Sequence, residues 1–349
     1  MKRFAQVTVV SVCVAMLGCC APNESDPVPQ EVTVLVVHAT SSDTLSFADA
    51  TAVAENGETA INDAGGWAGE RVQVISCAAT STKDVETCAN GAQPAVVVAS
   101  SEDAAAWSEV AFEDIAIIGP QSPDVPDTST SRRVPVAHHN EALAESLAAS
   151  LLDHPACGGG LYTSGGSAAG SSTTVEAIQR ATATAGGAYL GNLAVSGIDD
   201  KCVIHVSAGA DPTLDPEDLL AHPPIVLGLL DAAYTSDRRV ALAAAPFEVH
   251  VASSYLPLTG LTQDVDVNGF LEAGRAVAPD FVGDAAAVTT YLGLLLVREL
   301  VQNGDGPVGD VRDALLNSSD LARGGLGATW DWEQVRLTSP VHVFQKQIS

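Results

Sequence analysis

Polar side chains follow several apolar runs of this 349-residue chain at the point where each run ends. Ser100 and Ser101 directly follow the run 95–99, and Ser122 follows the run 115–118 after Gly119-Pro120-Gln121. In open parallel sheets, ligands bind beyond the carboxyl ends of strands, where helix N-termini offer N–H donors. Two such strand ends in series favour a site for a small polar ligand. Taken singly, Ser100 or Ser101 is explained equally well as a helix cap.

The loop after residue 163 invites two catalytic interpretations. Gly165, Ser167 and Ala169 approach the GxSxG nucleophile elbow of hydrolases, but the last glycine is missing and no His with an acidic partner is placed by the sequence. A phosphate-cradling loop needs a Lys after its glycines, and this loop has none. A flexible Gly/Ser loop is therefore the favoured interpretation, and no catalytic residue is assigned.

Cysteines and histidines are the remaining chemical candidates. Beyond residue 31 the cysteines are Cys77, Cys88, Cys157 and Cys202, a set of four that allows three disulfide connectivities. A zinc site is the competing interpretation, disfavoured because no CxxC pair exists. The eight histidines are scattered, and the pair His138-His139 is more typical of a solvated segment than of a metal site. We expect no metal site and no cofactor.

The element that must position these residues is a β-α-β unit over residues 32–75. The apolar run 32–37 precedes residues 47–61, whose apolar positions recur at helical spacing. Gly65-Gly66 ends the helix, because glycine accepts the left-handed conformation without a Cβ penalty. Residues 71–75 alternate like a strand. Further strands are expected at 202–206, 225–230, 241–244 and 249–255, and residues 329–332 and 341–344 are expected to pair as closing strands.

The amino terminus reads as an export signal. Lys2-Arg3 precede an apolar run, 7–17, that is too short to span a bilayer as a helix. The run ends at Gly18-Cys19, which resembles a bacterial lipobox with Cys19 as the lipidated residue; a plain cleaved signal is the alternative. The formal net charge of −27 argues against nucleic acid and anionic headgroups as partners, because both bind clustered Lys and Arg.

The chain resembles a known family. Ile61-Asn62-Asp63-Ala64-Gly65-Gly66, followed by Trp67 and residues 68–74, is similar to the opening of the type I periplasmic binding proteins, nearest to the branched-chain amino-acid binding proteins of ABC importers. The resemblance continues in order to about residue 345. It implies an α/β fold, a two-lobed type I clamshell in which each lobe is a mostly parallel sheet flanked by helices.

The resemblance also implies boundaries and disulfides. Residues 1–18 are then a lipoprotein signal peptide and 19–31 a flexible tether. Residues 32–135 and 250–325 form the first lobe, and residues 136–249 and 326–349 form the second. Relatives often bridge the region of Cys77 and Cys88, which implies the pairs Cys77–Cys88 and Cys157–Cys202.

Ligand contacts are implied residue by residue. The first-lobe strand ends match Ser100, Ser101 and Ser122, which hold the ligand's carboxylate in the family. Further contacts are implied at Tyr162, Asp231 and Tyr234 in the second lobe, and at Tyr255 on the strand that returns to the first lobe. Asp231 is equally explained as a helix cap and Tyr255 as packing at the crossing between lobes. Many relatives place an aromatic residue in the loop where this chain has residues 165–170, Gly-Gly-Ser-Ala-Ala-Gly, so the ligand class departs from the family pattern.

The implied function is that of an extracytoplasmic solute-binding lipoprotein, not an enzyme. It is expected to be a monomer, anchored to the bacterial cell membrane by its lipid, that captures a small polar ligand such as an amino acid or related amide. Its partner is then an ABC permease. The alternative is a sensor or protein-interaction scaffold of the same fold that has lost transport.

Overall fold

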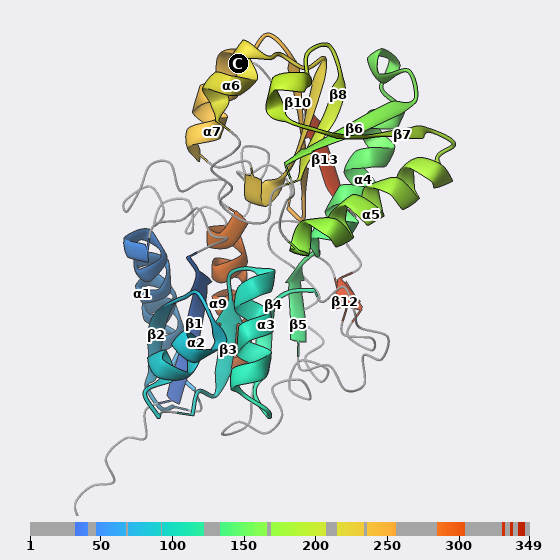
Figure 1. The fold of residues 1–349 in the computed structure, drawn as a ribbon. Coiled ribbons are helices and arrows are strands. Elements are labelled where there is room, and N and C mark those ends of the chain that lie inside the picture. Colours follow the sequence, from blue (N-terminus) through green and yellow to red (C-terminus); the bar gives the residue numbers. More distant parts are fainter. Residues whose placement is uncertain are drawn as a thin grey trace, which may run out of the picture. The chain divides into compact units, whose positions relative to one another are not determined.

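The computed structural model describes residues 32–40, 47–67, 69–91, 93–121, 133–165, 169–206, 215–233, 236–255, 285–303, 330–331, 336–337 and 341–345 (Figure 1). The signal and the tether lie outside these residues. Within the described part of the chain, no helix is both long and apolar enough to cross a bilayer.

The first sheet is fully parallel and has the strand order β2-β1-β3-β4-β5. Its strands are β1 (Val32–Ala39), β2 (Val72–Ala79), β3 (Val96–Ala99), β4 (Ala116–Pro120) and β5 (Arg133–Ala137). Nearly every residue of β1 and β3 is buried, as a parallel sheet covered on both faces requires. The continuous apolar runs that predicted these strands follow from that double burial.

Helices cover both faces of the first sheet. On one face, Val34 and Val36 pack in a cluster with α1 (Phe47–Asp63) and α9 (Ala285–Asn303). On the other, Leu35 and Val37 pack in a cluster with α2 (Thr82–Ala89) and α3 (Glu102–Ala111). The expected β-α-β unit is therefore present. Gly66 has a φ of +67°, and a Cβ there would lie 2.1 Å from the Glu70 carbonyl oxygen, so the turn after α1 requires glycine.

The second sheet has the order β13-β10-β9-β8-β6-β7, and only its edge strand β13 is antiparallel. Its strands are β6 (Gly160–Gly165), β7 (Ala188–Leu193), β8 (Cys202–Val206), β9 (Val226–Leu230), β10 (Glu248–Ser253) and β13 (His342–Gln345). The helices α4 (Asn140–Leu152) and α5 (Ala169–Thr184) pack on one face. The other face carries η2 (Val195–Gly197), α6 (Pro216–Ala221), η3 (Asp231–Ala233), α7 (Ser236–Ala241) and η4 (Leu242–Ala244).

The architecture confirms the predicted fold class: two mostly parallel sheets, each flanked by helices. Both disulfides implied by the resemblance are present, Cys77–Cys88 and Cys157–Cys202. Two local predictions were wrong. Residues 242–244 form the 3-10 helix η4 rather than a strand. The closing strands do not pair with each other: β11 (Trp330–Asp331) pairs with β12 (Arg336–Leu337), and β13 pairs with β10.

Strand β10 also bears on the predicted boundary at residue 250. It pairs with β9 and β13 in the second sheet along its length, so the boundary falls inside this strand. The short segments that follow β5 and β10 run side by side, because the His138 N–H donates to Ser254 Oγ at 2.8 Å.

Candidate functional site

The end of β3 carries Ser100 and Ser101. Ser100 is buried, and its hydroxyl and its backbone N–H both donate to the Val37 carbonyl oxygen at 3.1 Å, so it ties β3 to β1. Ser101 is partly exposed and caps α3: its Oγ accepts from the Ala104 N–H at 3.4 Å. The N-terminus of α3 and the Ser101 hydroxyl are therefore the groups at this strand end that are placed to meet an anion.

Two glutamates with opposite pKa shifts lie beside this helix end. Glu102 Oε1 accepts from the Asn140 N–H at 2.6 Å, which links the first turn of α3 to the start of α4. Burial, assisted by the nearby charge of Glu141, raises the pKa of Glu102 to about 7. A hydrogen bond from His139 lowers the pKa of Glu141 to about 2. Near neutral pH this corner therefore holds one carboxyl group that titrates and one that stays ionised.

The ends of β9 and β10 form a second group of polar side chains. Asp231 is partly buried, and its Oδ2 accepts from Ser253 Oγ at 3.1 Å and from the Ser254 N–H at 3.4 Å. Ser253 Oγ in turn accepts from the Tyr255 N–H at 3.1 Å. The carboxylate of Asp231 is thus fixed at the carboxyl end of β9 by the backbone and hydroxyls of the neighbouring strand.

Tyr255 directly follows the end of β10 and is buried, with its hydroxyl directed at β5 and α9. The hydroxyl donates to the Val136 carbonyl oxygen at 3.1 Å and lies 3.0 Å from Thr289 Oγ1. Burial raises the pKa of the phenol beyond its usual range, so it stays neutral. These bonds join β5, β10 and α9, which supports packing as the role of this side chain.

Two residues of β6, Tyr162 and Ser164, each contact a side chain from another segment. Tyr162 is in the interior of the strand, half-buried, with the Lys201 Nζ 5.9 Å from its ring centroid. Ser164 and His205 face each other across β6 and β8, with Oγ 3.0 Å from Nδ1, and both are fully buried. A Cβ on Gly165, where φ is +79°, would lie 2.8 Å from His205 Cε1, so only glycine fits the end of β6. This Ser–His pair is enclosed by its own strands, whereas the hydrolase interpretation rested on Ser167, outside the described residues.

The structure brings the predicted residues into two groups and leaves others apart. Ser100 and Ser101 share the end of β3, and Asp231 and Tyr255 lie at the ends of the neighbouring strands β9 and β10. Tyr162 lies away from both, within its strand. Ser122, Tyr234 and the lipidation candidate Cys19 lie outside the described residues. The sequence assigned no role to Glu102 and Glu141, although each is an acidic residue in the first turn of a helix, where a carboxylate meets the helix dipole.

Comparisons with known proteins address the fold. No protein-family model and no curated protein matches the chain. Solved structures do. An ABC transporter substrate-binding protein from Desulfitobacterium hafniense, in complex with Leu, aligns with a TM-score of 0.65 at 15% identity over 91% of this chain and 98% of that chain. An extracellular ligand-binding receptor from Verminephrobacter eiseniae gives 0.66 at 14% identity, over 90% and 97%.

The leucine-, isoleucine-, valine-, threonine- and alanine-binding protein from Brucella ovis, in its closed conformation, gives a TM-score of 0.66 at 13% identity. It is covered over 89% of its length by 90% of this chain. At such identities the likeness speaks to architecture, and it spans nearly the whole of each protein. The chain has the two-lobed α/β fold of the type I periplasmic binding proteins.

Proposed function

We propose that this protein is an extracytoplasmic solute-binding lipoprotein that captures an amino acid, or a related small zwitterion or amide, and delivers it to an ABC permease. The observation that carries the proposal is the likeness over 91% of the chain to a substrate-binding protein in complex with Leu. Capture in this fold needs no covalent step, only closure of two lobes around a ligand.

The polar groups at the strand ends support a zwitterionic ligand. The N-terminus of α3, with the Ser101 hydroxyl, suits a carboxylate. Asp231, a carboxylate held at the carboxyl end of β9, suits an ammonium group. Ser122 and Tyr234 remain proposed contacts. Ser100, Tyr162 and Tyr255 are assigned to holding strands and side chains in place, because the bonds or packing of each are internal.

The remaining parts of the proposal rest on the sequence. Cys19 is the proposed lipid attachment point, residues 19–31 the tether, and the bacterial cell membrane the location. The acidic balance of the chain argues against nucleic acid as a partner, and a monomer suffices for the proposed delivery. The lobe boundaries are proposed near residues 137 and 254, where β5 and β10 end.

A ligand screen followed by calorimetry tests the proposal. Amino acids, amides and short peptides are screened by thermal shift, and the best ligand is titrated into wild type, Ser101→Ala and Asp231→Asn. Losing one hydrogen bond to a charged group costs about 1.5–3 kcal/mol, so each variant is expected to bind roughly ten- to a hundredfold more weakly.

Ser81→Ala is the matched control. Ser81 caps α2 after β2 as Ser101 caps α3 after β3, with the same 3.4 Å hydrogen bond, so this variant loses a cap but keeps its affinity. If both site variants bind like wild type, the proposed contacts are misplaced. If no compound raises the melting temperature, the protein-interaction scaffold takes precedence.

A further inference from the structure

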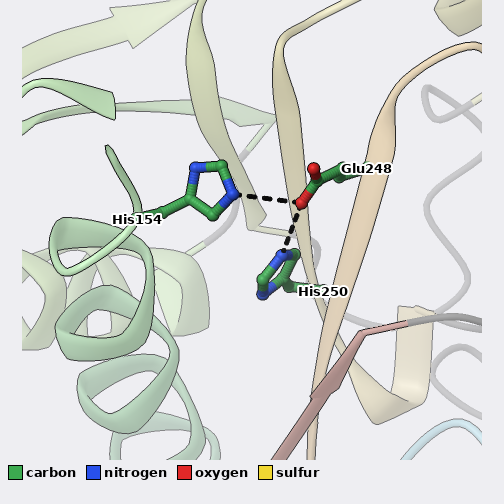
Figure 2. Close-up of side chains that lie close together, drawn as sticks. All are labelled: His154, Glu248 and His250. Carbon is green, nitrogen blue, oxygen red and sulfur yellow. Dashed lines mark hydrogen bonds and ion pairs between the residues drawn. The ribbon is translucent and has the colours of Figure 1, made fainter. Parts of the chain in front are cut away.

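Three side chains converge at the amino end of the second sheet, the end opposite the strand termini described above. His154 Nε2 lies 3.1 Å from Glu248 Oε2, and His250 Nε2 lies 3.4 Å from the same oxygen (Figure 2). The rings of the two histidines meet edge to face, 5.7 Å apart. From these contacts we propose that His154, Glu248 and His250 form a binding site for a divalent transition metal, with Zn²⁺ as the best-suited ion.

The backbone explains why these residues meet. Glu248 and His250 are two residues apart on β10, so they project from the same face of the sheet. Ala252, the next residue on that face, packs against α4, whose chain direction brings its C-terminal end toward Glu248. His154 follows α4 as the N-cap of η1 (Pro155–Cys157). Glu248 and His250 therefore lie on the sheet face that α4 covers, and His154 reaches them from the segment that follows α4.

The second disulfide holds the loop of His154 in place. Cys157, at the end of η1, is bonded to Cys202 at the start of β8. Cys202 pairs with Val226, and Val226 pairs with Glu248, so the three residues form one row across the sheet. The disulfide thus anchors the loop of His154 at Cys202, which lies two strand spacings, or roughly 10 Å, from Glu248.

The distances suit a tetrahedral metal. Zinc binds nitrogen and oxygen at about 2.0–2.2 Å, which places neighbouring ligand atoms of a tetrahedron about 3.3–3.5 Å apart. The two nitrogen–oxygen distances, 3.1 and 3.4 Å, are close to this edge length, and all three ligand atoms lie within 4.8 Å of one another. Two imidazoles and one carboxylate are a donor set that zinc uses with a fourth position left to water.

The surroundings allow an ion to enter. The side chains are partly exposed, at 19% for His154, 43% for Glu248 and 12% for His250. The acidic balance of the chain raises the local concentration of cations. The site is separate from the proposed ligand contacts: Glu248 and Ser253 are the two ends of β10, about 17 Å apart at the usual strand rise. The inference therefore does not depend on the proposed function.

Metal binding through Nε2 requires each neutral ring to carry its proton on Nδ1 instead of Nε2. In the metal-free protein each Nε2 donates its N–H to Glu248, and His154 Nδ1 accepts from the Ala156 N–H at 3.3 Å. A neutral imidazole that binds zinc through Nε2 carries its proton on Nδ1, so the Ala156 N–H loses its acceptor. That bond is long and exposed, and water replaces it at little cost. Binding is thus coupled to a small rearrangement of η1.

Calorimetry and metal analysis test the site. Protein without a polyhistidine tag is stripped with a chelator and titrated with ZnCl₂ in excess Mg²⁺, which occupies sites made of oxygen alone. One equivalent of zinc is expected to bind and to remain after gel filtration. His154→Gln, His250→Gln and Glu248→Gln are each expected to weaken binding at least tenfold. Cobalt(II) in place of zinc should give a visible spectrum typical of tetrahedral coordination, which His250→Gln abolishes.

His222→Gln is the matched control. His222 Nδ1 lies 3.1 Å from Asp199 Oδ2, the same distance as in the His154–Glu248 pair, and in the described part of the chain this more exposed pair has no third ligand. This variant should bind zinc like wild type. Absence of retained zinc in wild type overturns the proposal. So does wild-type affinity in both His154→Gln and His250→Gln, or an equal loss in His222→Gln, because each places the bound zinc elsewhere. Circular dichroism of each variant verifies the fold.

Discussion

The two ends of the second sheet treat polar side chains differently. At the carboxyl end, Asp231, Ser253 and Tyr255 form an internal network whose bonds join β9 to β10 and Tyr255 to β5, with one local bond between Tyr255 and Ser253. At the amino end, His154 and His250 both contact the same carboxylate oxygen of Glu248 and are partly exposed. Satisfied, buried networks hold strands together. Two histidine nitrogens that meet one carboxylate oxygen beside solvent are instead placed to bind a metal ion.

The largest expected effect comes from removing the disulfide that holds the amino end of the second sheet. Cys157–Cys202 closes 45 residues, and the chain-entropy model gives about 4 kcal/mol for a loop of that length. We expect the double Ala variant to lose about this free energy of unfolding in urea. We also expect it to bind zinc more weakly, because the loop of His154 is no longer held to the row of Glu248.

The first-sheet disulfide supplies the control. Cys77–Cys88 spans 11 residues, so its removal is expected to cost about 3 kcal/mol and to leave zinc affinity unchanged. Equal zinc affinity in both double variants contradicts the role assigned to Cys157–Cys202.

Glu102, beside the carboxyl end of the first sheet, is expected to make the free energy of unfolding depend on pH. Burial raises the pKa of Glu102 from 4.5 to about 7, so the folded chain keeps a proton that the unfolded chain releases. The contribution of this group to stability therefore falls as pH rises from 4.5 to about 7. Glu102→Gln keeps an acceptor for the Asn140 N–H and removes the charge. We expect it to exceed wild-type stability by at most about 3 kcal/mol at about pH 8 and to match it at about pH 4.

The measurement must be a difference between variants. Burial lowers the pKa of His38 from 6.5 to about 4, so its contribution rises with pH over that range and opposes that of Glu102. Urea unfolding of wild type and Glu102→Gln across the pH range cancels the His38 contribution. Glu86→Gln, at an exposed position of α2, is the control. A constant difference between Glu102→Gln and wild type at all pH values refutes the assignment.

Most of the fold was readable from periodicity. The first sheet is buried on both faces, so its strands appear as unbroken apolar runs, and Gly65-Gly66 marks the end of α1. Strand β7 was missed because it is an edge strand with no buried residue and contains Gly191 and Asn192. The Ala-rich segment 242–244 has no feature that distinguishes a buried strand from a turn of 3-10 helix.

The candidate site was less readable because side-chain direction is a tertiary property. Ser100 and Ser101 are adjacent and alike in sequence, yet one hydroxyl is buried against Val37 and the other caps a helix. The metal site left a weaker signal still. Glu248 and His250 form an E-x-H pair with strand alternation, but His154 is 94 residues from Glu248, and only the packing of α4 and a disulfide bring it there. The eight scattered histidines therefore gave no indication of it.

The smallest expected effect compares two positions on and just after β10. Tyr255→Phe removes the hydroxyl that bonds the Val136 carbonyl and Thr289, leaving buried polar groups without that partner. Such a loss costs about 1–3 kcal/mol, and we expect roughly 2 in urea unfolding of the metal-free protein. His250→Gln, at the other end of the strand, removes a partly exposed pair and is expected to cost less than about 1 kcal/mol.

Adding zinc is then expected to stabilise Tyr255→Phe more than His250→Gln, although Tyr255→Phe is the less stable variant without metal. Zinc stabilises whatever folded protein binds it, in proportion to the logarithm of its concentration over Kd. Tyr255→Phe keeps all three ligands, so zinc should raise its melting temperature as much as that of wild type. His250→Gln, nearly as stable as wild type without metal, should gain little. If zinc stabilises both variants equally, the ion is not held by the β10 histidine. If His250→Gln is the more destabilising change without metal, the amino end is a structural network like the carboxyl end.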